Sequence, residues 1–227
     1  MHSALPIDIV SQLIFSVAVM LKRCHLSSKK SYMTDLQQLF ERNLQAHQDV
    51  FAKLPVLAPQ ISQLTQRCYQ ALQQGGKILF MGNGGSAADS QHLAAEFVVR
   101  YKKERRALAS IALTTDTSIL TAGGNDYGFN QVFARQVEAL AKPEDIVIGI
   151  TTSGQSPNIN LALEAANNIG AYSVAFTGRD GGAVKDIAQL SLIVPSDVTA
   201  HIQEAHIFIG HYICEAIDEL VTAGSDS

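Results

Sequence analysis

The sequence has no tryptophan, only three cysteines and few charged residues. Cys24, Cys68 and Cys214 are odd in number and far apart, and none belongs to a Cys-x-x-Cys pair. Such spacing indicates neither a disulfide framework nor a thiolate metal site. It fits a reducing compartment, so we expect a cytoplasmic protein.

Charge is also scarce, since Asp, Glu, Lys and Arg make up 17% of the 227 residues and the formal net charge is -4. This balance provides no general attraction to nucleic acid, and we expect no nucleic-acid partner. Apolar residues account for 47% of the chain, which is enough for one sizeable core. A small-molecule ligand is therefore the expected partner.

The first 32 residues differ in pattern from the rest. The segment "DIVSQLIFSVAVML", 8–21, is apolar, but its basic neighbours follow it and it is shorter than the roughly 20 residues of a spanning helix. We expect no membrane association, with a membrane anchor as the alternative. Residues 1–32 are interpreted as a poorly ordered extension or a non-native start, and residues 33–227 as a single domain that begins at Met33.

Hydrophobic periodicity predicts amphipathic helices within 34–54 and 57–77, the second ended by Gly75 and Gly76. Short apolar runs separated by helix-length segments then predict five strands, and a long helix closes the chain over 199–221. Alternating strands and helices predict an α/β fold, with a parallel sheet covered by helices on both faces. The runs predicted as strands are 77–82, 108–113, 145–150, 172–178 and 190–195.

Two loops that follow predicted strands suit an anion. The loop "GNGGSAADS", 82–90, frees backbone amides at a helix start, where Gly84 and Gly85 permit close approach. The loop "TTSGQSPN", 151–158, gathers four hydroxyl groups around Gly154. A serine-rich capped turn would look the same, but two such loops in one sheet favour a phosphate. The lysine of a P-loop and the GxGxxG spacing are both missing, which disfavours a nucleotide.

His92 and Glu96 are four residues apart, so they project from one face of the helix that starts at the glycine loop. This spacing suits a metal site, or a base with its orienting partner, but a solvated helical face also shows it. In the closing helix, Gln203 and His211 lie within about a quarter turn of each other around the axis. His201 and His206 compete with them, and a histidine in such an apolar helix is often a core residue.

Five segments in this order resemble the bacterial phosphoheptose isomerases of the sugar isomerase (SIS) family: "GNGGSAADSQHLAAEF", "GGNDYGFNQVF", "GITTSGQSPN", "TGRDGG" and "HIQEAHIFIGHYI". The resemblance runs from about Thr34 to Val221. It implies a five-stranded parallel sheet flanked by helices, a flavodoxin-like three-layer sandwich preceded by N-terminal helices. It also implies a homotetramer whose active sites are shared between subunits.

The resemblance also assigns roles to individual residues. It implies that Glu96 is the catalytic base and His211 the catalytic histidine, and that one zinc ion per subunit is held by His92, Glu96, Gln203 and His211. A carboxylate that binds zinc is a poorer base, so the two roles of Glu96 compete. The residues implied to bind the sugar phosphate are Asn83, Gly84, Gly85, Glu96, Asn125, Asp126, Thr151, Thr152, Ser153, Ser156 and Gln203.

Two positions depart from the family pattern: Thr151 stands where serine is usual, and His201 stands where arginine is common. The implied reaction interconverts sedoheptulose 7-phosphate and D-glycero-D-manno-heptose 7-phosphate through an enediol, on the route to the heptose of lipopolysaccharide. Two alternatives stay open. One is a non-enzymatic SIS-family regulator that binds the replication initiator, and the other is an isomerase of a different sugar phosphate.

Overall fold

The computed structural model describes residues 35–223, which belong to two compact units, 1–48 and 49–227. Residues 1–32, which we interpret as an extension, lie outside the described residues, and so does Cys24. A helix covers residues 35–51, as the periodicity predicts. Its apolar side chains Leu36, Leu39, Phe40 and Leu44 are exposed.

The second unit begins with a 3-10 turn, η1 (Leu54–Leu57), and helix α2 (Ala58–Gln73). Helix α2 ends where the sequence predicts, because Gly75 adopts a φ of 83° that only glycine takes easily and the Gly76 amide bonds back to Ala71 O. The chain then turns into the first strand.

The sheet has five parallel strands, β1 (Ile78–Gly82), β2 (Ser110–Ala112), β3 (Ile146–Ile150), β4 (Tyr172–Gly178) and β5 (Leu190–Val194). Their spatial order is β2-β1-β3-β4-β5, and each pair is parallel. All residues of β1 and β3 are buried, as expected of strands covered on both faces. All five predicted strands are confirmed.

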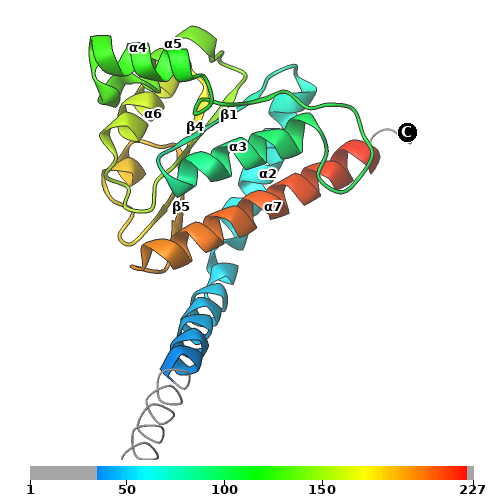
Figure 1. Cartoon of the computed structure of the whole chain (residues 1–227). Helices are drawn as coiled ribbons and strands as arrows, with labels where there is room; N and C mark the ends of the chain where they lie inside the picture. Colours follow the sequence, from blue (N-terminus) through cyan, green and yellow to red (C-terminus); the bar gives the residue numbers. More distant parts are fainter. Residues whose placement is uncertain (1–34, 224–227) are drawn as a thin grey trace, which may run out of the picture. The chain divides into compact units, whose positions relative to one another are not determined.

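Helices cover both faces of the sheet (Figure 1). Alternate strand residues such as Phe80 and Ile148 pack against α2, α3 (Gly85–Val98) and α7 (Thr199–Ala223). The intervening residues, such as Met81 and Val147, pack against α5 (Ala134–Leu140) and α6 (Pro157–Ile169). The three-layer α/β fold is thus confirmed. The remaining elements are α4 (Thr117–Tyr127), η2 (Phe129–Gln131) and η3 (Ala183–Asp186).

Within residues 35–223, no helix combines the length and the apolar character that crossing a membrane requires. The two described cysteines, Cys68 and Cys214, are buried and free of disulfides. Burial raises the pKa of the Cys68 thiol to about 12, and it also raises the pKa of Cys214. Both thiols are therefore neutral at physiological pH and pack as small apolar groups.

Candidate active site

The strand order reverses between β1 and β3, because the chain moves outward from β1 to β2 and then returns to the other side of β1. In open α/β sheets, ligands bind outside the carboxyl ends of the strands at this reversal point. The first loop, residues 83–85, follows β1, and the second, residues 151–156, follows β3. We call these the phosphate loops. Topology thus brings the two predicted anion-binding segments together.

A pair of amides ties the phosphate loops to each other. Asn83 Nδ2 donates to Asn158 Oδ1 at 2.9 Å, and Asn158 Nδ2 donates to Asn83 Oδ1 at 2.9 Å. Asn158 is buried, whereas Asn83 is partly exposed. Between Asn83 and the helix start, Gly84 has a φ of 54°, which turns the chain so that α3 begins at Gly85.

Hydroxyl groups line the second phosphate loop. Thr151 Oγ1 and Ser156 Oγ lie 3.1 Å apart, and Ser156 is the N-cap residue of α6. Ser153 Oγ accepts a hydrogen bond from the Gln155 amide at 3.3 Å, which leaves its own hydrogen available to an anion. Thr152 is partly exposed beside it. The loop therefore offers hydroxyl donors at the start of a helix, where an anion is favoured.

The loop after β4 packs against the backbone of the second phosphate loop. Gly154 has a φ of 66°, and a side chain there would collide with the backbone of Gly181 and Gly182. The Val184 amide also donates to Gly154 O at 3.0 Å. The segment "TGRDGG" thus fixes the phosphate loop by backbone contact, which explains why both segments are rich in glycine.

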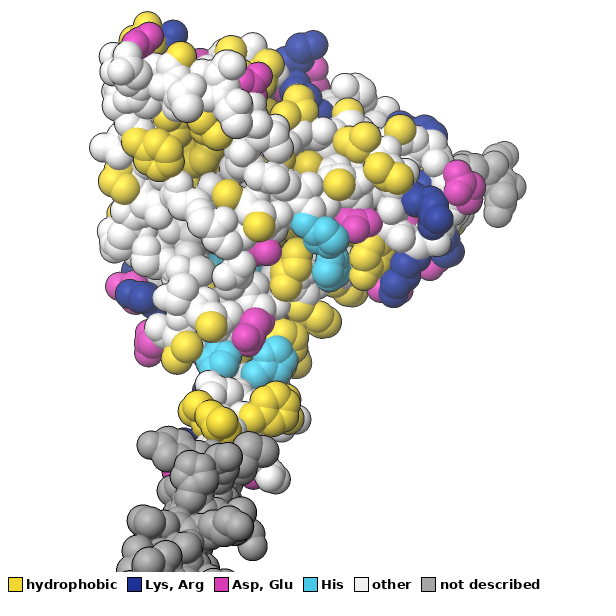
Figure 2. Space-filling view, in the orientation of Figure 1, with side chains coloured by type: hydrophobic (Ala, Val, Ile, Leu, Met, Phe, Trp, Pro, Cys, Tyr) yellow, Lys and Arg dark blue, Asp and Glu magenta, His cyan; other side chains and the backbone are white. Residues whose placement is uncertain are grey.

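A second group of side chains joins α3 to α7, which lie side by side in Figure 1. His92 Nε2 of α3 lies 2.8 Å from His211 Nε2 of α7, and Glu96 Oε1 lies 3.5 Å from His92 Nε2. Figure 2 shows histidine side chains gathered on this face over the two helices. We call His92, Glu96, Gln203 and His211 the α3–α7 cluster. His92 of α3 faces His211 of α7, which a row of solvated helical residues would not do.

Gln203 connects the α3–α7 cluster to the first phosphate loop. Its side-chain amide lies against Gly85, where any added side chain would displace it. The carboxylate of Asp89, one turn before His92, is near enough for the Gln203 side chain to act on its pKa. Burial raises the pKa of Asp89, and it outweighs the opposing effects of the Gln203 hydrogen bond and of the two histidines.

The environment of His211 favours its neutral form. Burial is the largest cause that lowers the pKa of His211, and the nearby His92 adds to it. The charge of Glu96 opposes both. With one nitrogen facing His92 Nε2 at 2.8 Å, at least one of the two rings must be neutral at that nitrogen to accept a hydrogen bond.

The two competing histidines of α7 lie elsewhere. His206 is fully buried and its Nε2–H donates to Thr177 O at 3.0 Å. Burial lowers the pKa of His206 to about 4, so this residue is a neutral core histidine. His201 is buried and its Nδ1 lies 3.0 Å from Glu204 Oε2. Neither joins His92 and Glu96.

Asn125 and Asp126 lie apart from the other candidates. They belong to the last turn of α4, a helix with no buried residue, and Asn125 Nδ2 donates to Asp126 Oδ1 at 2.7 Å. Within residues 35–223, no hydrogen bond or ion pair links them to the phosphate loops or to the α3–α7 cluster. Figure 1 shows α4 well away from α7.

Three residues with a place at this site were not singled out from the sequence. Asn158 ends the segment "TTSGQSPN", so its position after a phosphate loop was a usable signal. Asp89 lies one helical turn before His92, which is a weaker signal. Tyr101, whose ring stacks on His211 at a centroid distance of 5.4 Å, lies in an irregular loop with no periodicity to reveal it.

The α3–α7 cluster has the donor types that zinc prefers, namely two imidazole nitrogens and a carboxylate. With Zn–N distances near 2.0–2.1 Å, two tetrahedral nitrogen ligands are roughly 3.3 Å apart. The 2.8 Å between His92 and His211 is shorter than that, so the rings would separate slightly. The donor atoms of His92, Glu96 and His211 do not all lie within 4.8 Å of one another, so Glu96 would turn inward. The donor set fits zinc after these small adjustments.

Comparison with known proteins adds independent information. A family model described as the SIS domain matches residues 27–178, which is more than half of the chain. The chain belongs to the SIS domain family. A phosphoheptose isomerase of Paramagnetospirillum magneticum is 57% identical over 155 residues, 68% of this chain and 81% of that protein. One from Aquifex aeolicus is 56% identical over 170 residues, 75% of this chain and 89% of that protein.

Solved structures agree with the SIS assignment. The phosphoheptose isomerase of Neisseria gonorrhoeae matches with a TM-score of 0.76 and 42% identity, over 81% of this chain and 99% of that one. The phosphoheptose isomerase of Francisella tularensis matches with a TM-score of 0.75 and 40% identity, over 82% and 98%. Both solved structures are matched over nearly their whole length, so they share the fold of this chain.

Proposed function

We propose that this SIS protein is an aldose–ketose isomerase that interconverts sedoheptulose 7-phosphate and D-glycero-D-manno-heptose 7-phosphate. The observation that carries the proposal is the α3–α7 cluster, where His92 lies 2.8 Å from His211 of α7 and 3.5 Å from Glu96, on the helix that begins at the glycine loop. Relatives at 57% and 56% identity are named phosphoheptose isomerases. Function is argued from such a site, because the fold alone hosts many activities.

The reaction needs a base that removes the proton from the carbon beside the carbonyl, and an acid that protonates the carbonyl oxygen. Glu96 is the proposed base, and its side chain is 21% exposed at the cluster. His211 is the proposed acid. Positioned acid–base groups contribute roughly 10²–10⁴-fold in rate. The enediol forms when both transfers have occurred, and reversal on the neighbouring carbon completes the isomerisation.

The phosphate loops are proposed to hold the substrate phosphate and to align the open-chain sugar. Thr151, Thr152, Ser153 and Ser156 offer hydroxyl groups, and Asn83, Gly84 and Gly85 offer the amides at the start of α3. Gln203 is proposed to contact the sugar between the two groups. Binding of the phosphate, which is far from the reacting carbons, then orients the substrate and takes no part in proton transfer.

Zinc is the proposed cofactor, one ion per subunit, with His92, Glu96, Gln203 and His211 as its ligands. A bound zinc ion would polarise the substrate carbonyl as a Lewis acid. A carboxylate that held the ion would be a poorer base, so the two roles proposed for Glu96 would compete.

A homotetramer with shared active sites is also proposed. An apolar cavity of about 380 Å³ opens beside η1, α2 and α7, and Phe208 and Tyr212 at its edge are half exposed. Exposed apolar patches of this kind mark interfaces. Helix α4 has no buried residue, and a neighbouring subunit would bury part of it. Asn125 and Asp126 would then reach an active site only in the assembly. A monomer at micromolar concentration in light scattering would contradict this assembly.

We further propose that residues 33–227 form one SIS domain and that the protein is cytoplasmic. The tests of activity and assembly can therefore use protein that starts at Met33.

The decisive experiment is incubation of the purified protein with sedoheptulose 7-phosphate, with and without added zinc, followed by separation of the sugar phosphates. The proposal requires an aldose product. Its absence under every condition would refute the enzyme and favour a non-enzymatic role. Turnover of another sugar phosphate instead would keep the acid–base chemistry and replace the substrate.

A further inference from the structure

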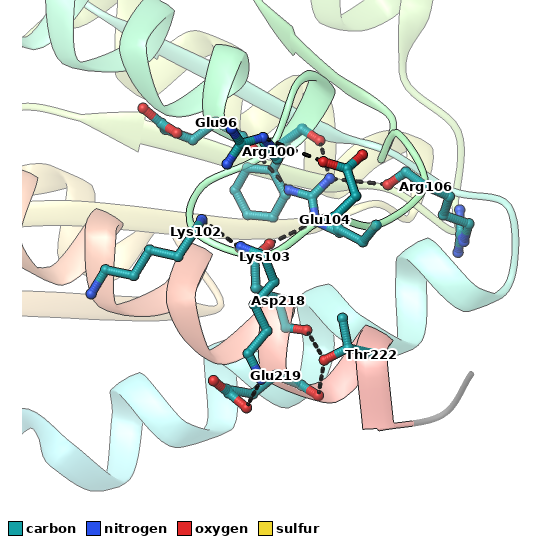
Figure 3. Close-up of polar contacts among 11 residues, drawn as sticks. Glu96, Arg100, Lys102, Lys103, Glu104, Arg106, Asp218, Glu219 and Thr222 are labelled. Atoms are coloured by element: carbon teal, nitrogen blue, oxygen red, sulfur yellow. Dashed lines mark hydrogen bonds and ion pairs between the residues drawn. The ribbon is translucent and has the colours of Figure 1, made fainter. Parts of the chain in front are cut away.

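The segment between α3 and β2 crosses over to α7 instead of turning directly into the sheet. We call this segment, residues 99–109, the strap. It leaves α3 one turn after Glu96, reaches the last turns of α7, and returns to β2 (Figure 3). The strap therefore touches both helices that carry the α3–α7 cluster.

Asp218 of α7 is the anchor of the strap. Its Oδ2 accepts the amides of Lys102 at 2.8 Å and Lys103 at 3.0 Å, as Figure 3 shows. Its Oδ1 accepts Arg105 Nε at 2.6 Å. Although burial acts to raise it, the pKa of Asp218 is lowered because these three donors together outweigh burial. The carboxylate is thus charged, and both of its oxygens accept hydrogen bonds from the strap.

Arg105 extends the anchor to α3. Its Nη2 donates to Glu96 O at 2.8 Å and its Nη1 donates to Phe97 O at 3.0 Å. The side chains of Arg105 and Asp218 are 2% and 1% exposed. Separation of a buried ion pair is strongly destabilising, because it would leave each charge unpaired at low dielectric. The backbone of Glu96 is thereby tied to α7.

The strap places one aromatic ring on the proposed acid. Tyr101 stacks on His211 at a centroid distance of 5.4 Å and an interplanar angle of 24°. It directly precedes the two residues whose amides bond to Asp218. Lys102 Nζ also lies over the Tyr101 ring, 5.2 Å from its centroid. His211 is therefore held between His92 on one side and Tyr101 on another.

We propose that Tyr101 is a positioning residue for His211, and that the buried Arg105–Asp218 pair anchors the strap that places it there. The phenol takes no part in proton transfer. Its ring limits the rotation of the imidazole, so that Nε2 stays directed toward His92 at the site. The catalytic part of this inference rests on the proposed function.

The outer ion pairs of the strap have a lesser role. Lys102 Nζ lies 2.9 Å from Glu215 Oε2, and Lys103 pairs with Glu219, but all four side chains are well exposed. Exposed pairs contribute little because water screens them. Glu215→Gln is therefore expected to leave turnover and the position of Tyr101 unchanged.

The test compares Tyr101→Leu, which removes the ring, with Tyr101→Phe, which keeps it. Tyr101→Leu is expected to lower kcat by about 10-fold with KM within about 2-fold, because misplacement of a catalytic group costs rate more than binding. Tyr101→Phe should match the wild type. Equal loss in Tyr101→Phe, or wild-type kcat in Tyr101→Leu, would overturn the proposal.

Tyr172→Leu is the matched control. Tyr172 is likewise partly buried and packed against a cation, Arg67, but it begins β4, an inner strand of the sheet, and its ring contacts Arg67 instead of His211. It should retain wild-type kcat. Asp218→Asn, if it folds, should lower kcat no further when combined with Tyr101→Leu, because both changes act through one contact. Full additivity would show that Asp218 acts by another route.

A second readout needs no substrate. Diethyl pyrocarbonate modifies accessible imidazoles, and mass spectrometry reports the rate at His211 alone. Loss of the stacked ring in Tyr101→Leu should speed this modification severalfold, whereas Tyr101→Phe and Tyr172→Leu should not. An unchanged rate would refute the stacking contact. If the wild type fails to isomerise sugar phosphates, the proposed function falls but this measurement still decides whether Tyr101 positions His211.

Discussion

The phosphate loops and the α3–α7 cluster share helix α3 but are built differently. The phosphate loops consist of backbone amides and hydroxyl groups held by near neighbours, with the Asn83–Asn158 pair as their link. In the α3–α7 cluster, His92 and His211, which are 119 residues apart in sequence, meet from two helices. The first arrangement suits a ligand of fixed charge, and the second suits transfer of protons.

The difference implies that substitutions in the two regions should impair different steps, substrate binding in one and turnover in the other. A phosphate loop that loses one donor keeps its chemistry and binds less well. A cluster that loses its base or acid still binds and no longer reacts. Each prediction below separates these two outcomes.

The largest effect is expected in the α3–α7 cluster. Glu96→Gln and His211→Gln should each lower kcat by about 10²-fold or more, because each removes one partner of the proposed acid–base pair. Steady-state kinetics with sedoheptulose 7-phosphate would measure this. Exchange of the proton beside the carbonyl, followed in deuterated water, should vanish in Glu96→Gln. Wild-type exchange in that variant would show that another group is the base.

His206 tests whether position on α7 alone makes a histidine functional. Its pKa is about 4 in the folded protein because of burial, and near 6.5 when unfolded. Below pH 6.5 the unfolded chain therefore binds a proton that the folded chain does not, so stability falls as the pH falls toward 4. The loss from this group should reach about 3 kcal/mol in free energy of unfolding.

Chemical denaturation at several pH values would measure the effect of His206. His206→Phe should lack this part of the slope between pH 6.5 and pH 4, and should keep the kcat of the wild type at neutral pH. A slope equal to that of the wild type would mean that His206 is not the neutral buried group described here.

A smaller effect is expected from the link between the phosphate loops. Asn158→Ala removes both hydrogen bonds to Asn83, and KM for the sugar phosphate should rise about 10-fold with little change in kcat. Asn160→Ala is the matched control on the same helix, since its buried side-chain oxygen has no hydrogen-bond partner within residues 35–223. A drop in kcat alone for Asn158→Ala would place this pair in the chemistry instead.

The smallest effect should come from Ser153→Ala, which removes one hydroxyl donor among several. We expect KM to rise about 5-fold, equivalent to roughly 1 kcal/mol, with kcat unchanged. Inhibition by inorganic phosphate should weaken in parallel. If KM and phosphate inhibition both stay as in the wild type, the second phosphate loop does not hold the phosphate.

The sequence alone determined the layers of this fold and the place of its loops. Apolar runs separated by helical segments predicted all five strands, and Gly75 and Gly76 correctly marked the end of α2, because these signals depend on local periodicity and backbone freedom. The phosphate loops were visible for the same reason. The outer bounds differed little, as with β2, which is Ser110–Ala112 within the predicted 108–113.

Only the tertiary structure decided which side chains of α3 and α7 meet. Periodicity gave His201, His206 and His211 no order of preference, because all three lie on a helix that is apolar over much of its surface. Packing directed His206 into the core against Thr177 and His211 toward His92. The stack of Tyr101 on His211 depends on a strap held by a buried ion pair between residues 113 apart, and such long-range contacts have no period in the sequence.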